Sequence, residues 1–203
     1  MYMKNQVKEI FEAEAKAVLN IPVDDSFEKA VNLIYDHVHR RGGKLVTSGM
    51  GKAGQIAHDI ATTFCSTGTP SVFLHPSEAQ HGDLGVLQKN DIMMVISNSG
   101  KTREIIELTE LKENLYPGMP LIVITGNPEA ELSKKAECTI FTGRPAEICP
   151  LGLTPTTSTT VMTVIGDALV FLLMNKIGFT AEDYAKRHHG GYLGTKSREL
   201  TGR

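Results

Sequence analysis

The sequence predicts a doubly wound α/β fold, with a five-stranded parallel sheet flanked by helices. Five short apolar runs predict the strands, and each is closed by Gly, Pro, Ser or Asn. Segments with helical spacing of apolar residues separate them, and this alternation is typical of a parallel sheet covered on both faces. Such a sheet binds ligands at the carboxyl ends of its strands, beside the topological switch point.

Two amphipathic helices are expected before the first strand. Their apolar residues recur at helical spacing, at Val7, Ile10, Phe11, Ala15, Val18 and Leu19 and then at Phe27, Val31, Ile34, Tyr35 and Val38. The expected strands are 44–47, 71–74, 92–96, 121–125 and 139–141, and the helices between them are 53–65, 102–114 and 130–135. An irregular segment follows at 143–153, and helices at 156–177 and 181–187 close the pattern.

Length and composition favour one domain and exclude several classes of protein. The 203 residues, 41% of them hydrophobic, fit a single domain with a helical pair (1–41), an α/β core (42–155) and C-terminal helices (156–203). The net charge of -2 and the scattered Lys and Arg residues argue against nucleic-acid binding. The longest apolar run, Ala168–Met174, is too short to span a membrane, and no signal peptide begins the chain. We therefore expect a cytoplasmic protein without a membrane partner.

The three cysteines predict reduced thiols. They are odd in number and widely spaced, which does not suit a disulfide framework or a zinc knuckle. Cys65 and Cys138 are expected in the core. Cys149, beside Pro150, has no histidine assigned to it and is a poor candidate for a nucleophile.

The loop Ser97–Thr102 has the composition of a phosphate site. It follows the apolar run 92–96 and precedes a helix, so backbone N–H groups, hydroxyls and the positive end of the helix dipole meet there. Glu104, two residues further on, would face the rest of such a ligand. The alternative is a capping loop, in which Ser97, Ser99 and Thr102 satisfy the free N–H groups of the helix.

A glycine turn at Gly49–Gly54 places Lys52 at the start of a helix. The turn matches G-x-G-x-x-G, but no Asp or Glu follows about 20 residues later, as a dinucleotide site requires. The spacing does not fit a Walker loop either. An ammonium group is unfavourable at a helix N-terminus, so Lys52 is better explained by an anionic ligand.

Three further segments have polar residues of interest. The loop 76–85 reads as a binding loop, in which His75, His81, Glu78 and Asp83 could bind a metal or, as we favour, the histidines bind substrate hydroxyls or cap the loop. The threonine run after Pro155 either caps the last long helix or contacts an anion or sugar. His188 either completes a helix C-terminus or has a functional role.

Taken together, these motifs strongly resemble the D-arabinose 5-phosphate isomerase family of sugar isomerase (SIS) domain enzymes in Gram-negative bacteria. The resemblance runs from about Val46 to Leu193. It rests on Gly49-Met50-Gly51-Lys52, His75-Pro76-Ser77-Glu78-Ala79, His81-Gly82-Asp83-Leu84-Gly85, Ser97-Asn98-Ser99-Gly100, Cys149-Pro150-Leu151-Gly152-Leu153, Gly178-Phe179-Thr180-Ala181-Glu182-Asp183 and His188-His189-Gly190-Gly191.

The resemblance implies the SIS fold, which is flavodoxin-like, and a set of site residues. The family's catalytic residues fall on Lys52, Glu104, Glu147 and His188, and its phosphate cradle on Ser97–Thr102. Its substrate-binding positions fall on Ser48, Gly49, Gly68, Thr69, His75, His81, Ser97, Asn98, Ser99, Gly100 and Thr102. No cofactor or metal is required, although inhibitory zinc can bind at the position of His75. The family commonly has proline where His189 stands, and many members continue into CBS modules that this short form lacks.

The implied reaction interconverts D-ribulose 5-phosphate and D-arabinose 5-phosphate through an enediol, at the entry to 3-deoxy-D-manno-octulosonate (Kdo) synthesis for lipopolysaccharide or capsule. A carboxylate in a closed site can have its pKa raised toward neutrality, as a general base requires. We assign Glu147 as the base, His188 to ring opening or oxygen protonation, and Lys52 to charge stabilisation. Glu104 orients substrate or shares the acid–base work, and the two glutamates could exchange roles.

The resemblance also implies a homo-oligomer, a dimer or a tetramer, with active sites shared between subunits. Two other functions stay open. One is a non-catalytic regulatory module that binds a sugar phosphate, and the other is an isomerase of a different phosphosugar.

Overall fold

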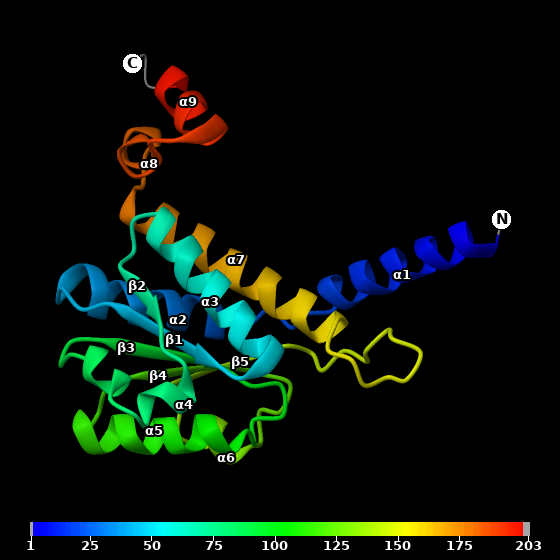
Figure 1. Cartoon of the computed structure of the whole chain (residues 1–203), viewed down its shortest axis with the longest axis horizontal. Coiled ribbons are helices and arrows are strands. Elements are labelled where there is room, and N and C mark those ends of the chain that lie inside the picture. The colour runs from blue at the N-terminus through cyan, green and yellow to red at the C-terminus, as the bar shows by residue number, and fades with distance from the viewer. Residues whose placement is uncertain (1, 201–203) are drawn as a thin grey trace.

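A computed structural model describes residues 2–200 and confirms the α/β fold. Its five strands are β1 (Leu45–Gly49), β2 (Ser71–Phe73), β3 (Ile92–Ile96), β4 (Leu121–Thr125) and β5 (Cys138–Phe141). All the strand pairs are parallel, and the strands lie in the order β2-β1-β3-β4-β5 (Figure 1). This is the flavodoxin-like order, and its topological switch point lies between β1 and β3.

Helices cover both faces of the sheet. On one face lie α2 (Ser26–Ile34), α3 (Gly51–Ser66) and α7 (Thr157–Ile177), and on the other α4 (Pro76–Ala79), α5 (Arg103–Leu115) and α6 (Glu131–Lys134) (Figure 1). In β3, Met94 packs into the first of these two cores and Met93 into the second. Because both of their faces are buried, β3 and β4 are continuous apolar runs, which made them predictable.

Most predicted elements agree with the structure within about two residues, and α8 (Ala181–Arg187) agrees at both ends. The sequence interpretation missed α4, α9 (Gly191–Leu200) and a 3-10 turn at Asp83–Val86, and it did not indicate that its second helix continues as a π-helix at Tyr35–Arg40. All but α9 are short or continue a neighbouring helix, so they have little periodicity of their own.

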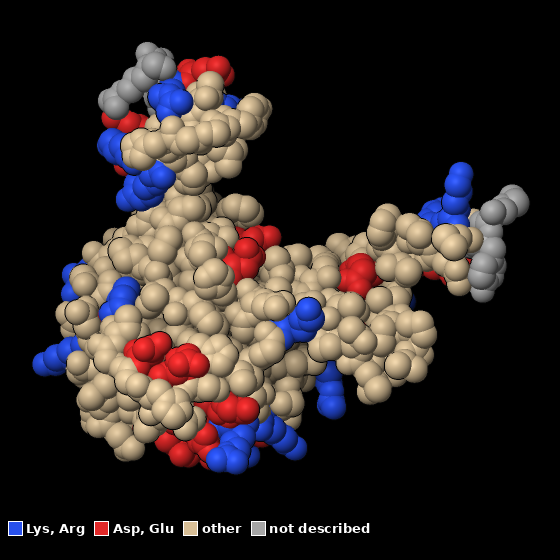
Figure 2. Space-filling view, viewed as in Figure 1, with Lys and Arg blue, Asp and Glu red and all other residues tan. Residues whose placement is uncertain are grey.

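Two helical arms extend from this α/β body. One is α1 (Tyr2–Leu19), and the other is the C-terminal arm formed by α8 and α9, which stands beyond the end of α7 (Figure 1). The first helix is amphipathic as predicted, but much of its apolar face is not covered: Phe11 is 68% exposed and Leu19 84% exposed. In Figure 2 uncharged surface lies along both arms, and the Lys and Arg side chains are scattered over this side of the molecule.

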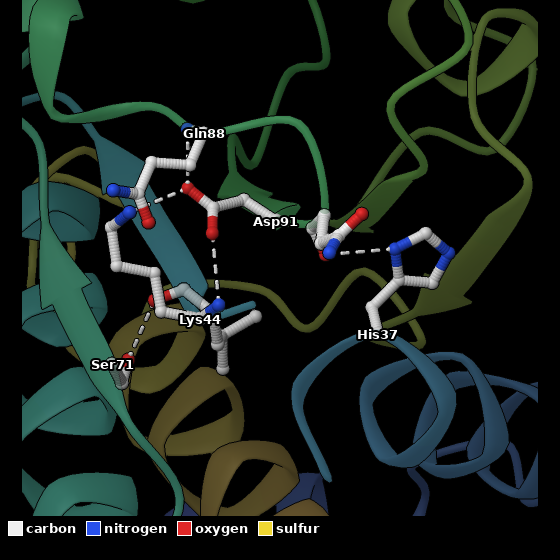
Figure 3. Close-up of polar contacts among 7 residues, drawn as sticks. His37, Lys44, Ser71, Gln88 and Asp91 are labelled. Carbon is white, nitrogen blue, oxygen red and sulfur yellow. Dashed lines mark hydrogen bonds and ion pairs between the residues drawn. The ribbon is translucent and has the colours of Figure 1, made fainter. Parts of the chain in front are cut away.

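The amino-terminal edge of the sheet is closed by a buried ion pair (Figure 3). Lys44 Nζ lies 2.6 Å from a carboxylate oxygen of Asp91, which is fully buried. The same carboxylate accepts hydrogen bonds from the backbone N–H groups of Lys44 (2.9 Å) and Gln88 (2.8 Å). A buried charge that is paired and hydrogen-bonded in this way joins the starts of β1 and β3.

Of the two cysteines expected in the core, one is buried and the other is exposed. Cys138 is buried, as expected, and burial raises the pKa of its thiol to about 11. Cys65 is exposed, because it lies on the outer side of α3, so its placement in the core was wrong. Among the described residues one helix, α7, is long and apolar enough to cross a membrane, and 50% of its most apolar window is buried against the rest of the protein.

Candidate functional site

The carboxyl ends of the strands open into a cavity of about 480 Å³. This size is typical of small-molecule sites. The cavity lies beside the switch point, and segments after β1, β3, β4 and β5 contribute to it together with the start of α7. Its lining consists of Met50, Lys52, Ala53, Ile96, Ser97, Asn98, Ser99, Lys101, Thr102, Asn127, Arg144, Pro155, Ser158, Thr159 and Met162.

The hydroxyl loop after β3 forms one wall of this cavity. Ser97 Oγ and Thr102 Oγ1 are 2.9 Å apart and hydrogen-bonded, which closes the loop across its base. Gly100 has φ +65, and a Cβ there would come within 2.5 Å of Ala130 Cβ. The loop therefore needs glycine at this position for both backbone conformation and space.

The structure decides against the capping interpretation for Thr102. This residue stands immediately before α5, but its side chain caps no N–H group of the helix and instead pairs with Ser97. Ser99 Oγ accepts a hydrogen bond from the backbone N–H of Lys101 (3.1 Å), within the loop itself. The hydroxyls of Ser97, Ser99 and Thr102 thus shape the loop that lines the cavity.

The turn after β1 brings Lys52 to the same cavity. Lys52 is the second residue of α3, and it is exposed. A Cβ on Gly49 would come within 2.7 Å of Ala53 O, so this glycine lets α3 approach β1 closely. Ser48, expected to bind substrate, is fully buried and donates a 2.6 Å hydrogen bond to Leu74 O, so its hydroxyl connects two strands.

Glu147 lies at the N-terminus of α7 and lines a second hollow, beside the end of α1. Its Oε2 accepts hydrogen bonds from the backbone N–H groups of Thr156 (2.8 Å) and Ser158 (3.3 Å). Burial acts to raise the pKa of this carboxyl, but the hydrogen bonds from Ser158 and Thr156 outweigh it, and the pKa is lowered. The shift is opposite to the one expected for a general base.

The same contacts correct the prediction that threonine hydroxyls cap this helix. The side chain of Thr156 makes no capping hydrogen bond to α7, and its hydroxyl instead donates to Glu147 (3.3 Å). A carboxylate at a helix N-terminus is favoured by the helix dipole as well as by its N–H donors. The cap is therefore supplied by Glu147, nine residues earlier in the chain, which local spacing does not indicate.

Glu104 and His81 meet in a separate hollow of about 280 Å³ beside the cradle. Arg103 and Glu107 line the same hollow and form an ion pair of 2.6 Å on the outer side of α5. The hollow joins the first turn of α5 to the loop after α4. The two predicted residues are thus brought together, but not in the cavity of Lys52.

His75 stands immediately before α4. Its Nδ1 accepts a hydrogen bond from the backbone N–H of Ser77 (3.3 Å), and its side chain lines a third hollow with Gly49 and His58. Within residues 2–200 no group of three or more His, Cys, Asp or Glu side chains is placed to hold a metal ion. The interpretation of His75 as part of the loop structure fits this geometry.

The remaining predicted residues lie away from the cavity within one chain. His188 ends α8 in the C-terminal arm, where its ring stacks on Tyr184 with centroids 3.7 Å apart. Thr69 precedes β2 and so lies at the amino-terminal end of that strand, whereas the cavity lies at the carboxyl ends. Its Oγ1 is 3.1 Å from His39 Nε2. A Cβ on its neighbour Gly68 would come within 2.8 Å of the Phe179 ring, so Gly68 allows the arm to pack at this end of β2.

Sequence reasoning did not single out Arg144, and it judged Cys149 a poor candidate for a nucleophile without indicating the environment of its thiol. Arg144 lies in the irregular segment after β5, where no motif marks it.

Backbone N–H groups of Thr154 (3.1 Å) and Leu153 (3.2 Å) point at Cys149 Sγ and lower the pKa of this thiol to about 7. The local chain fold, rather than a neighbouring histidine, produces this shift, which the sequence could not indicate.

Comparisons with known proteins identify the family. The SIS domain model matches residues 39–172, and the chain belongs to the SIS domain family. Over 185 residues it is 46% identical to the arabinose 5-phosphate isomerase KdsD of Pseudomonas aeruginosa, covering 91% of this chain and 55% of that protein. The chain spans about half the length of the curated relatives it matches.

Two solved structures are similar over nearly their whole length. A Bacteroides fragilis protein, proposed to be a phosphosugar isomerase involved in capsule formation, is 66% identical, with a TM-score of 0.92 over 94% of this chain and 99% of that one. The protein c3406 of Escherichia coli CFT073, in complex with arabinose 5-phosphate, is 36% identical, with a TM-score of 0.82 over 90% of this chain and 95% of that one.

Proposed function

We propose that this SIS-domain chain is a cytoplasmic aldose–ketose isomerase that interconverts D-ribulose 5-phosphate and D-arabinose 5-phosphate, the first step of Kdo biosynthesis. The observation that carries the proposal is the cavity in which Lys52 lies beside the hydroxyl loop Ser97–Thr102. A phosphate held by that loop would leave the sugar within the same cavity. The arabinose 5-phosphate complex of a relative that this chain matches over 90% of its length supports the same substrate class.

The loop Ser97–Thr102 anchors the phosphate in this proposal. Its hydroxyls and backbone N–H groups are donors for phosphate oxygens, and the N-terminus of α5 adds the positive end of a helix dipole. The ammonium of Lys52 stabilises the negative charge that develops on the enediolate oxygens. Stabilising such charge in a partly enclosed site is a major source of rate acceleration.

Glu147, Glu104 and His188 carry the proton transfers. The reaction moves a proton between C1 and C2, so it needs a base near those carbons and an acid that opens the sugar ring. We assign the base to Glu147, which requires substrate to displace a donor such as the Thr156 N–H from its carboxylate. If Glu147→Gln kept solvent-proton exchange at C2 while Glu104→Gln abolished it, the two roles would be reversed.

The active site is completed by a second copy of the chain. His188 ends α8, in the arm that stands beyond the end of α7 (Figure 1), and it does not line the cavity of its own chain. Both arms carry exposed apolar side chains, among them Phe11 (68%) and Tyr192 (74%). Exposed apolar surface of this kind marks an interaction site. We propose a homodimer or a dimer of dimers in which the arm of one subunit brings His188 to the cavity of another.

The direct test is to incubate the purified protein with ribulose 5-phosphate and follow the formation of arabinose 5-phosphate. We expect turnover without added metal or cofactor, and its loss in Lys52→Met. The matched control is Lys89→Met, which alters an exposed lysine outside the cavity. Tight binding of the sugar phosphate without any product would contradict the enzyme and favour a regulatory binding module, and turnover of another phosphosugar alone would contradict the substrate.

A further inference from the structure

Arg144 has a backbone conformation that its residue type does not explain. Its φ is +51, and among the described residues it is the non-glycine residue with a positive φ. It also precedes Pro145, and a residue before proline favours extended backbone. Glycine would take this conformation at little cost, whereas a Cβ is strained there. Such strained residues are found disproportionately at functional sites.

The surrounding chain holds this turn in place. The N–H of Arg144 donates to Thr142 Oγ1 (3.3 Å), and the N–H of Thr142 donates to Thr125 O (3.0 Å), next to the end of β4. Gly143 is pressed against the chain after α1, because a Cβ there would come within 3.0 Å of Asn20 O. The turn is therefore fixed from two sides, and so is the direction of the Arg144 Cα–Cβ bond.

The side chain of Arg144 lines the cavity on the far side of the cradle from Lys52. Lys52 follows β1 and Arg144 follows β5, and in the sheet order the cradle after β3 lies between them. The cavity lining contains Lys52, Lys101 and Arg144 and no Asp or Glu. Within residues 2–200 none of these three cations takes part in an ion pair. The cavity thus has an uncompensated positive charge on both sides of the cradle.

We propose that Arg144 is a phosphate-binding residue, whose guanidinium contacts the anion held by the loop Ser97–Thr102 from the side opposite Lys52. This inference rests on the phosphate site of the proposed function. The planar guanidinium matches phosphate oxygens in a bidentate arrangement, which an ammonium cannot provide. The strain at φ +51 is then retained because glycine, which would relieve it, would remove the guanidinium.

The test distinguishes the contribution of the Arg144 guanidinium to phosphate binding from the effect of its strained backbone on stability. Dissociation constants for inorganic phosphate are measured by calorimetry for the wild-type chain, Arg144→Gln, Arg144→Gly and Arg144→Lys, with Arg40→Gln, in the π-helix outside the cavity, as a control. We expect phosphate binding to weaken about tenfold in the Gln and Gly variants and less in the Lys variant, because a hydrogen bond to a charged group is lost. The Tm of Arg144→Gly should rise by about 2 °C as the strain is relieved.

Loss of phosphate binding in Arg144→Gly together with an unchanged or higher Tm would support the proposal, because a merely structural arginine would not give that pair of results. Wild-type phosphate affinity in both Arg144→Gln and Arg144→Gly would overturn it. If those variants also isomerised ribulose 5-phosphate with the wild-type KM, the proposed function would stand without Arg144. If phosphate binding depended on Arg144 but the wild-type chain formed no arabinose 5-phosphate, the proposed function would fail and the assignment of Arg144 would stand.

Discussion

The α/β body and the two arms bury their apolar residues to very different degrees. In the body all five residues of β3 and all five of β4 are buried, and the helices on both faces pack against them. In the arms, by contrast, Leu19 is 84% exposed and Leu200 is 70% exposed. The body therefore buries its hydrophobic residues within one chain, whereas the arms leave many of theirs exposed.

This difference separates two kinds of function. The body holds its polar groups in fixed positions, as with the hydroxyl pair of Ser97 and Thr102, which are 2.9 Å apart. The arm that carries His188 is held mainly by local contacts, such as the capping box at Thr180. In the proposed function the body therefore binds the sugar phosphate, and the chemistry assigned to His188 depends on where a second copy would place the arm.

The largest effect is expected from His188→Ala. If the arm brings a catalytic acid or base to a partner's cavity, kcat should fall by about 10²–10⁴-fold. The free energy of unfolding should change little, because the arm packs only lightly on the body. His189→Ala, at an exposed neighbour, is the matched control and should keep wild-type activity. The opposite ranking of these two variants in a steady-state assay would move the role to His189.

A smaller effect is expected from Phe11→Asp on the apolar face of α1. Phe11 is 68% exposed, and a charge there would oppose its burial between subunits. We expect self-association to weaken about 30-fold, as for an interface hot spot, with a parallel loss of activity at low protein concentration. Light scattering measures the change in mass, and Glu9→Ala, on the other side of the helix, should leave it unaltered. A monomeric wild-type chain with full activity would refute the shared site.

The sequence predicted the body better than the arms for the same physical reason. Runs such as 92–96 and 121–125 are buried on both faces, so their composition alone marks them as strands. The apolar periodicity of α1 predicted a helix but not how exposed its apolar face is. The spacing of apolar residues does not indicate whether the rest of the chain covers that face.

The site was predictable where chemistry is local in sequence. The cradle lies within six consecutive residues, and the glycine turn places Lys52 beside it. By contrast, the pKa of Glu147 is lowered by hydrogen bonds from Thr156 and Ser158. These residues lie nine and eleven positions later in the sequence. The left-handed backbone of Arg144 depends in the same way on Thr142 and on contacts with the chain after α1, so neither feature has a signature in the sequence.

A further test concerns the body alone. Thr102→Val keeps the shape of the side chain but removes the hydroxyl that pairs with Ser97. Because this loop anchors the phosphate in the proposed function, we expect KM to rise about tenfold while kcat stays near its wild-type value. Thr62→Val, at an exposed position of α3, is the control in the same assay. A fall in kcat with unchanged KM would instead place Thr102 in the chemical step.

The smallest effect concerns Glu147, which joins the segment after β5 to the start of α7. Its pKa is lowered from 4.5 in the folded chain, so its ionised form stabilises the fold above that pH, and this contribution is lost as pH falls through the folded pKa. Glu147→Gln should therefore lower Tm by about 2 °C at pH 7, and the difference from wild type should close as the pH falls below 4.5. Thermal melts between about pH 3 and 8 measure it, with Glu12→Gln on the exposed side of α1 as the control. A gap of constant size across that range would mean that the Tm difference does not come from the ionisation of Glu147.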